Sequence, residues 1–272
     1  MTGALDGFSE SAMAYGGLTR TVYRAGSGPA VIVIEEIPGI TPEVEAFARR
    51  VIDAGFTAVL PSLFGVPGKP ISLPYVISSV TRACVAREFL ALKLDRTAPV
   101  IGWLRRLARE AHAECGGPGV GVVGMCFTGG FALGMMIDDE ILAPVLSQPS
   151  VPFAIGRTRR AALGISDDDL TRVKERVSQG ACVLGLRFTA DRNVPPERFE
   201  TLRRELGDGF IAVEIDSSPG NAFGIKKTAH SVVTNELVDE PGHPTRVALD
   251  RVLAFLRERL EVAESPGPTV DD

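Results

Sequence analysis

Short apolar runs alternate with helical patterns along most of the chain. The run at 30–34, AVIVI, is compact and β-branched, as expected of a strand that is buried on both faces. Thr41 then offers an N-cap, Pro42 suits the first helical position, and apolar residues recur at helical spacing until Gly55. The run at 56–60 predicts the next strand. Such alternation is typical of parallel βα units.

The same criteria predict elements over the rest of the chain. Further strands are expected at 120–123, 142–146, 182–188 and 210–215. Helices are expected at 81–93, 98–113, 129–137, 167–178, 196–206 and 247–260.

Domain organisation follows from the breakers and from the absence of repeats. Residues 65–80 hold too many glycines and prolines for a regular element, so they are expected to leave the sheet. We expect one domain over 1–272, with 65–97 as a lip over a site. The last residues, 264–272, are expected to form a flexible acidic tail.

Composition and charge exclude several classes of protein. The chain is 45% hydrophobic and 23% charged, which is ordinary for a globular protein. A net charge of −5 argues against nucleic-acid binding, which needs a basic face. No apolar stretch approaches the roughly 20 residues that span a bilayer, and the first residues lack a signal-peptide pattern. We therefore expect a cytoplasmic protein with neither a nucleic-acid nor a membrane partner.

The four cysteines and three histidines form no metal-binding pattern. There is no CxxC pair, and no His/Cys spacing resembles a zinc site, so neither a metal nor another cofactor is expected. A GxGxxG pattern occurs at 119–124, but its glycines bracket an apolar run instead of the turn that follows it. A dinucleotide site is therefore not favoured.

The sharpest local pattern is VGVVGMCFTGG at 120–130. A strand runs into Gly124, one residue, Cys126, and then a helix opened by small residues. This is the form of a nucleophile elbow, a tight turn that lifts one side chain above a sheet. The helix start directs its free N–H groups at the sulfur, which raises the thiolate fraction. The competing interpretation is a buried core cysteine, but the placement at an elbow favours a nucleophile.

Several landmarks, in order, resemble the dienelactone hydrolase family of α/β-hydrolases, whose members carry cysteine where most α/β-hydrolases carry serine. They are the segments 34–40 (IEEIPGI), 58–65 (AVLPSLFG), 124–127 (GMCF), 189–195 (TADRNVP) and 230–231 (HS). The resemblance implies an α/β-hydrolase fold, with helices on both faces of a mostly parallel sheet of about seven or eight strands. It also implies a carboxylic ester or lactone substrate, hydrolysed through an acyl-cysteine.

The resemblance implies a role for each residue of a catalytic triad. Cys126 would attack the carbonyl, His230 would move the proton, and Asp191 would orient the imidazole. The order Cys, Asp, His agrees with the order of nucleophile, acid and base in this fold.

Three further residues receive roles from the same resemblance. The backbone N–H groups of Ile37 and Phe127 would form the oxyanion hole. Glu36 would pair with the cysteine thiol and help its deprotonation. Glu35 is a competitor for that role, but its spacing to Gly39 fits less well.

The triad residues have competitors elsewhere in the chain. His243 lies in a turn before the closing helix, and His112 lies inside a predicted helix; the sequence around His230 favours that residue. The acids at 167–169 look like helix-cap residues, whereas Asp191 follows an apolar strand. The cysteines other than Cys126 are interpreted as packing residues: Cys84, Cys115 and Cys182.

Departures from the family pattern concern the substrate. Thr128 stands where the family has glycine, and its hydroxyl can either cap the helix or narrow the site. Arg82 or Arg87 would be the lip arginine that grips a substrate carboxylate, but the arginine expected shortly after His230 is absent. The segments 152–169 and 216–229 are long. The alternatives to an ester or lactone hydrolase are a thioesterase and a non-catalytic relative that binds a small molecule or a partner.

Overall fold

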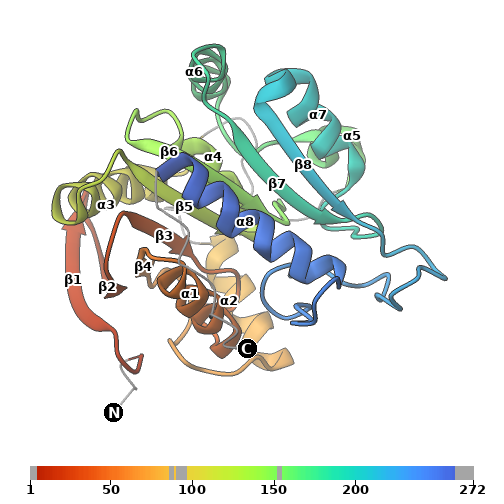
Figure 1. Ribbon diagram of the computed structural model, residues 1–272, viewed down its shortest axis with the longest axis horizontal. Coiled ribbons are helices and arrows are strands. Elements are labelled where there is room, and N and C mark those ends of the chain that lie inside the picture. Colours follow the sequence, from red (N-terminus) through yellow and green to blue (C-terminus); the bar gives the residue numbers. More distant parts are fainter. Residues whose placement is uncertain (1–4, 86–88, 90–96, 152–154, 261–272) are drawn as a thin grey trace, which may run out of the picture.

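A computed structural model describes residues 5–85, 89, 97–151 and 155–260, and its centre is an eight-stranded sheet (Figure 1). The strand order is β1-β2-β4-β3-β5-β6-β7-β8. The strands from β3 to β8 are parallel, while β2 pairs antiparallel with β1 and with β4. The strands are β1 (Ser9–Tyr15), β2 (Leu18–Gly26), β3 (Ala30–Ile34), β4 (Thr57–Pro61), β5 (Val120–Met125), β6 (Ile141–Ser147), β7 (Val183–Phe188) and β8 (Phe210–Ile215).

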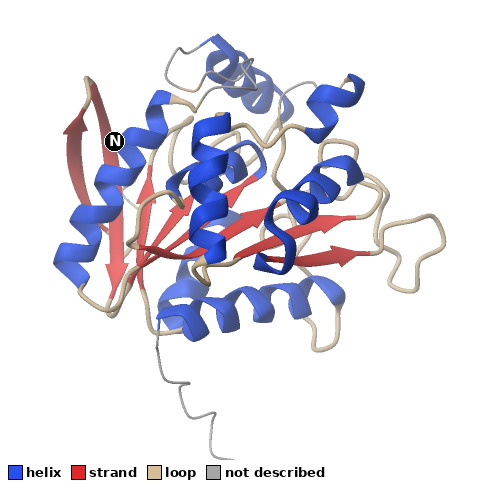
Figure 2. Ribbon diagram, turned by 90° about the horizontal axis from the view of Figure 1, so that it is seen from above, coloured by secondary structure: helices blue, strands red, loops and turns tan. Residues whose placement is uncertain are grey.

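Helices cover both faces of the sheet, as Figure 2 shows. The α-helices are α1 (Pro42–Asp53), α2 (Leu73–Val85), α3 (Pro99–Cys115), α4 (Gly129–Met135), α5 (Gly156–Ala161), α6 (Asp167–Ser178), α7 (Pro196–Leu206) and α8 (Pro244–Leu260). Two short 3-10 turns are η1 (Cys126–Thr128) and η2 (Gly207–Gly209). Within the described residues, none of the helices has the length and apolar character needed to cross a bilayer.

The central strands are buried on both faces, which confirms the expected α/β architecture. Every residue of β3 is buried, and alternate side chains enter two different cores. Ile32 and Ile34 pack in the cluster formed with α3 and α4. Val31 and Val33 pack in the other cluster, formed with α1 and α8. A continuous β-branched run is therefore the correct sequence signature for this strand.

Local capping signals also hold in the structure. The Thr41 side chain accepts a hydrogen bond from the backbone N–H of Val44 at the start of α1, and Pro42 occupies the first turn. Ser166 caps α6 in the same way, and three aspartates fill the first turn of that helix. The acids at 167–169 are thus helix-cap residues, as predicted.

The prediction for 65–80 was wrong in its second half, because α2 begins at Leu73. Pro74 was counted as a breaker, but it lies in the first helical turn, where a missing N–H costs no hydrogen bond. The predicted helix at 81–93 is thus the end of α2, and its later residues lie outside the described part of the chain. Likewise, α8 begins at Pro244, before the expected start at 247.

The sequence also failed to predict three elements. The hairpin of β1 and β2 lies at the edge of the sheet, and β1 has a single buried residue, Met13, so it lacks the apolar run of a central strand. The short helix α5 lies inside the segment 152–169 and buries no residue. The predicted tail at 264–272 lies outside the described residues.

Candidate active site

The turn between β5 and α4 has the backbone geometry of an elbow. Cys126 has a φ of 54°, a left-handed conformation that non-glycine residues seldom adopt. A Cβ on Gly124 would lie 2.3 Å from the carbonyl oxygen of Thr128, and one on Gly129 would lie 2.7 Å from Pro149 Cα. Both positions therefore need glycine, since backbone passes too close for a side chain.

Thr128 holds this turn against the neighbouring strand. Its buried hydroxyl accepts a hydrogen bond from the backbone N–H of Met125 at 2.8 Å and lies 3.1 Å from the carbonyl oxygen of Ile34, at the end of β3. The hydroxyl makes no cap hydrogen bond to α4, so the structure gives it a role that the sequence analysis did not consider, which is to brace the elbow against β3.

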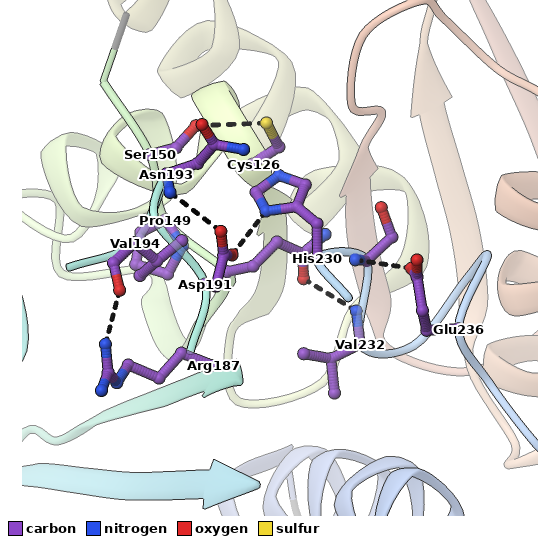
Figure 3. Close-up of polar contacts among 12 residues, drawn as sticks. Cys126, Pro149, Ser150, Arg187, Asp191, Asn193, Val194, His230, Val232 and Glu236 are labelled. Atoms are coloured by element: carbon purple, nitrogen blue, oxygen red, sulfur yellow. Dashed lines mark hydrogen bonds and ion pairs between the residues drawn. The ribbon is translucent and has the colours of Figure 1, made fainter. Parts of the chain in front are cut away.

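The side chains of Asp191 and His230 meet beside Cys126 (Figure 3). Asp191 follows β7, and its Oδ2 lies 2.6 Å from Nδ1 of His230, which follows β8. The other carboxylate oxygen accepts the backbone N–H of Asn193 at 2.9 Å, which fixes the carboxylate plane. With Nδ1 directed at the carboxylate, Nε2 is the nitrogen that is left to exchange a proton.

The electrostatic surroundings of His230 favour its charged form. Burial by itself would lower the pKa of His230, but the nearby Cys126 and the bond to Asp191 outweigh it. The pKa of this histidine is therefore raised well above its ordinary value. An imidazolium beside Cys126 can pair with a thiolate, which is the reactive form of a cysteine nucleophile.

A serine that the sequence analysis missed contacts the thiol. The Cys126 Sγ lies 3.1 Å from the Ser150 Oγ, and the Ser150 backbone N–H donates to the Cys126 carbonyl at 2.8 Å. Ser150 follows the carboxyl end of β6, the strand next to β5 in the sheet. Its position after a central parallel strand is the one signal that could have identified it.

Glu36 has three hydrogen-bond partners, and none of them is the thiol. The carboxylate is only 3% exposed and accepts from Ser231 Oγ at 2.7 Å, Thr234 Oγ1 at 2.5 Å and Gln148 Nε2 at 3.3 Å. Ser231 and Thr234 belong to the segment that carries His230. In this structure Glu36 thus joins the end of β3 to the histidine segment, in place of the expected contact with Cys126.

Glu35 points to a different neighbour. Its Oε1 accepts the backbone N–H groups of Leu63 at 2.6 Å and Phe64 at 3.0 Å, at the end of β4. Burial raises the pKa of Glu35 to about 8, although the two backbone N–H groups partly oppose that shift. Glu35 therefore joins β3 to β4, and its hydrogen bonds go to the end of β4 and not to Cys126, Asp191 or His230.

The competing histidines have other partners. His243 Nδ1 lies 2.7 Å from Thr245 Oγ1, and its ring packs edge-on against Phe223. His112 Nε2 lies 3.1 Å from the carbonyl oxygen of Gly117, at the end of α3. Cys115 and Cys182 pack against the two cores, and the side chain of Cys84 lies outside the described residues.

The structure describes three of the residues that are expected to contact the substrate: Ile37, Arg82 and Phe127. Phe127 is the second residue of η1, where backbone N–H groups have no partner within the turn. The side chain of Ile37 packs against the core cluster that contains Phe127. Arg82 is exposed and lines a pocket of about 350 Å³ together with Arg20, Ser62, Ser79 and the phenyl rings of Phe64 and Phe89. Those two rings each lie 6.4 Å from the Phe127 ring. Arg87 lies outside the described residues.

The part of the chain that the structure describes holds no group of three metal-ligating side chains.

A mostly parallel eight-stranded sheet in this order, with an elbow after β5, defines an α/β-hydrolase fold. The sequence narrows the class further, because the family model for the dienelactone hydrolase family matches residues 17–258. The chain therefore belongs to the dienelactone hydrolase family, a family of hydrolases, as the sequence landmarks predicted.

Known relatives are distant. A Saccharomyces cerevisiae protein named "Putative carboxymethylenebutenolidase" is 24% identical over 183 residues, which cover 66% of this chain and 63% of that protein. A Salmonella typhimurium protein with the same name is 26% identical over 207 residues, covering 73% and 68%. The structure of dienelactone hydrolase from Anabaena variabilis matches with a TM-score of 0.57 at 15% identity, covering 93% of this chain and 99% of that one. This structural likeness concerns the fold alone.

Proposed function

We propose that the protein hydrolyses a carboxylic ester or lactone through an acyl-cysteine formed on Cys126. The observation that carries this proposal is the position of His230, held by Asp191 at 2.6 Å on one side and facing Cys126 on the other. Each group has the chemistry that its position requires: a thiol at an elbow, an imidazole with one free nitrogen, and an orienting carboxylate.

In the first half of the reaction, the thiolate of Cys126 attacks the carbonyl carbon while His230 holds the proton. The resulting oxyanion accepts hydrogen bonds from the backbone N–H groups of Ile37 and Phe127. The carbon–oxygen bond to the alcohol then breaks, and His230 gives its proton to the departing oxygen. In the second half, His230 takes a proton from water, which attacks the thioester. Cleavage of the carbon–sulfur bond releases the acid and restores the thiolate–imidazolium pair.

The substrate class is proposed from the pocket and the relatives together. The curated relatives are named for a lactone hydrolase activity, and we extend to this chain the general class, an ester or lactone. The proposed lip arginine, Arg82, lines the same pocket as the phenyl rings of Phe64 and Phe89. These groups suit an acyl compound with an apolar part, and Arg82 would meet a carboxylate if the substrate carries one. Arg87, the other candidate for that role, lies outside the described residues.

The test is a burst experiment with p-nitrophenyl acetate, followed by mass spectrometry of the quenched protein. We expect a burst of nitrophenol and an acetyl group on the peptide that carries Cys126. Cys126→Ala removes both signals. His230→Ala lowers turnover by about 10²–10⁴, the usual contribution of a general acid–base group.

His243→Ala is the matched control, because that imidazole is hydrogen-bonded to Thr245 and does not contact Cys126. Its turnover stays within a few-fold of the parent protein. An acetyl group on another residue, or a loss of turnover in His243→Ala but not in His230→Ala, contradicts the proposal. A folded parent protein that shows neither a burst nor steady turnover of any ester or thioester supports the non-catalytic alternative.

A further inference from the structure

A buried arginine on α7 has no role in the steps above. Arg198 is 2% exposed, and its hydrogen bonds all go to backbone carbonyls. Nε donates to Ala162 at 2.7 Å, Nη2 to Arg159 at 2.9 Å, and Nη1 to Pro149 at 2.9 Å and Asn193 at 3.1 Å. The described part of the chain offers it no carboxylate within ion-pair distance. A buried charge without a counter-ion is costly, so its retention calls for a reason.

Two of those carbonyls belong to the segments that flank the thiol (Figure 3). Pro149 precedes Ser150, whose hydroxyl contacts the Cys126 sulfur at 3.1 Å. Asn193 donates its backbone N–H to Asp191, the carboxylate that holds His230. One guanidinium therefore fixes the segment after β6 and the segment after β7 with respect to each other.

The positive charge of Arg198 is not neutralised by its neighbours outside the candidate site. They are Cys126, Asp191, and the pair of Arg160 and Glu197, which are joined at 2.7 Å and largely offset each other. Burial lowers the pKa of Arg198 to about 10, and Cys126 and Asp191 counteract that effect, so the guanidinium is charged at neutral pH.

A charge count shows what the guanidinium adds. A thiolate on Cys126, an imidazolium on His230 and a carboxylate on Asp191 carry a net charge of about −1 in a largely buried site. With Arg198 included, the four groups are neutral in total. Without it, the same ion pair forms in a site with an uncompensated negative charge, which disfavours the thiolate.

We propose that Arg198 is a positioning residue for the nucleophile: it clamps the segments of Ser150 and Asp191 and supplies the buried positive charge that balances the thiolate–imidazolium–carboxylate group. This proposal rests on the proposed function for the identity of the nucleophile. It adds a residue outside the triad on which the reactivity of Cys126 depends.

The test measures alkylation of Cys126 by iodoacetamide, followed peptide by peptide with mass spectrometry, at pH 7 and pH 9.5. At pH 9.5 an ordinary thiol is mostly ionised, so the ratio of the two rates reports the stabilisation of the thiolate and is insensitive to access. The assay needs no ester. If the parent protein forms no acyl-cysteine, the proposed function fails, while the alkylation ratio still decides the role of Arg198.

Arg198→Met removes both the charge and the clamp. We expect alkylation at pH 7 to slow by about tenfold or more, the effect of removing a nearby opposite charge, with a much smaller change at pH 9.5. Arg198→Lys keeps the charge but gives up the planar fork. Its alkylation at pH 7 should stay within about threefold of the parent, while turnover of p-nitrophenyl acetate falls because the segments are no longer clamped.

Arg176 supplies the matched control. It is 7% exposed and also donates to four backbone carbonyls, those of Met136, Asp138, Ile141 and Asp139. These lie at the opposite end of β6 from Ser150, roughly 20 Å away along a strand of this length. Arg176→Met should lower the melting temperature without changing the alkylation ratio of Cys126.

Three results overturn the proposal. The first is an unchanged ratio in Arg198→Met, and the second is an equal change in Arg176→Met. The third is an alkylation rate at pH 7 in Arg198→Lys that falls tenfold or more. If Arg198→Met does not fold, Arg198→Lys decides alone. An unchanged ratio of the alkylation rates at pH 7 and pH 9.5, together with a loss of p-nitrophenyl acetate turnover, then supports the proposal.

Discussion

Replacing Glu36 by glutamine separates two roles for this residue. The family resemblance assigns Glu36 to the thiol, whereas the structure gives its carboxylate to Ser231, Thr234 and Gln148. Glutamine has the same shape but keeps one acceptor oxygen and replaces the other with an NH₂ group. If Glu36 joins β3 to the histidine segment, we expect Glu36→Gln to lower the free energy of unfolding. If it acts on the thiol, stability should hardly change.

The magnitude follows from the hydrogen bonds. A hydrogen bond to a buried charged group contributes about 1.5–3 kcal/mol. Glutamine can still accept from one hydroxyl, and the other hydroxyl can turn to accept from the new NH₂ group. It then lacks an acceptor for its own proton, and every remaining bond loses its charge assistance. We estimate a net loss of about 2–4 kcal/mol, which lowers the melting temperature of a domain of this size by about 5–10 °C.

The assay is thermal and urea unfolding of Glu36→Gln, Ser231→Ala and the double variant. Ser231→Ala removes one donor and leaves two, so its effect should lie at the lower end of the range for one hydrogen bond to a buried charged group, about 1.5–2 kcal/mol. Because the two side chains share a hydrogen bond of 2.7 Å, the double variant should lose less stability than the sum of the two single ones. A glutamine variant that melts within about 1 °C of the parent, or additive effects in the cycle, would refute this reasoning.

Three variants and one labelling experiment give further tests. Glu35 binds its proton more tightly in the folded state, where its pKa is about 8, than in the unfolded state, near 4.5, so its contribution to stability is lost as pH rises between these values. Measured by urea unfolding, the free energy of unfolding of Glu35→Gln should rise relative to that of the parent by on the order of 4 kcal/mol between pH 4.5 and pH 8. A difference that does not depend on pH would contradict this. Gly124→Ala places a Cβ 2.3 Å from the carbonyl oxygen of Thr128 and should cost about 3 kcal/mol in urea unfolding, whereas Gly102→Ala, in open space on α3, should stabilise by up to about 1 kcal/mol. Among the four cysteines, Cys126 should react first with limiting iodoacetamide at pH 7; faster labelling of another cysteine would argue against an activated elbow.

Features that depend on neighbours in sequence could be predicted, and those that depend on distant contacts could not. The strand at 30–34, the cap at Thr41 and the elbow around Cys126 each result from a few adjacent residues, so their patterns were sufficient. Pro74 was misinterpreted because a proline inside a helix and one in its first turn look alike until the helix start is known. The hairpin of β1 and β2 was missed because an edge strand needs little apolar surface.

Within the candidate site, the same distinction holds. His230 and Asp191 were chosen by their local contexts, and the structure brings them together across 39 positions. Two of the partners of Glu36, Ser231 and Thr234, lie more than 190 positions away, and the third, Gln148, lies 112 positions away. The carbonyls that Arg198 binds at Pro149 and Ala162 likewise belong to other segments. No local pattern specifies such contacts, because they depend on how the loops after different strands pack against each other.

The contact of Glu36 with Ser231 and Thr234 has a consequence for the order of events during synthesis. These side chains are separated by 195 and 198 positions, so a chain still on the ribosome makes β3, the elbow and Cys126 long before the histidine segment emerges. Until then the buried carboxylate of Glu36 lacks two of its donors, and Cys126 lacks the imidazole that is proposed as its base. A nascent chain that ends before residue 230 thus holds Cys126 without the proposed base, so the proposed ester hydrolysis would begin only after nearly all of the fold has been translated.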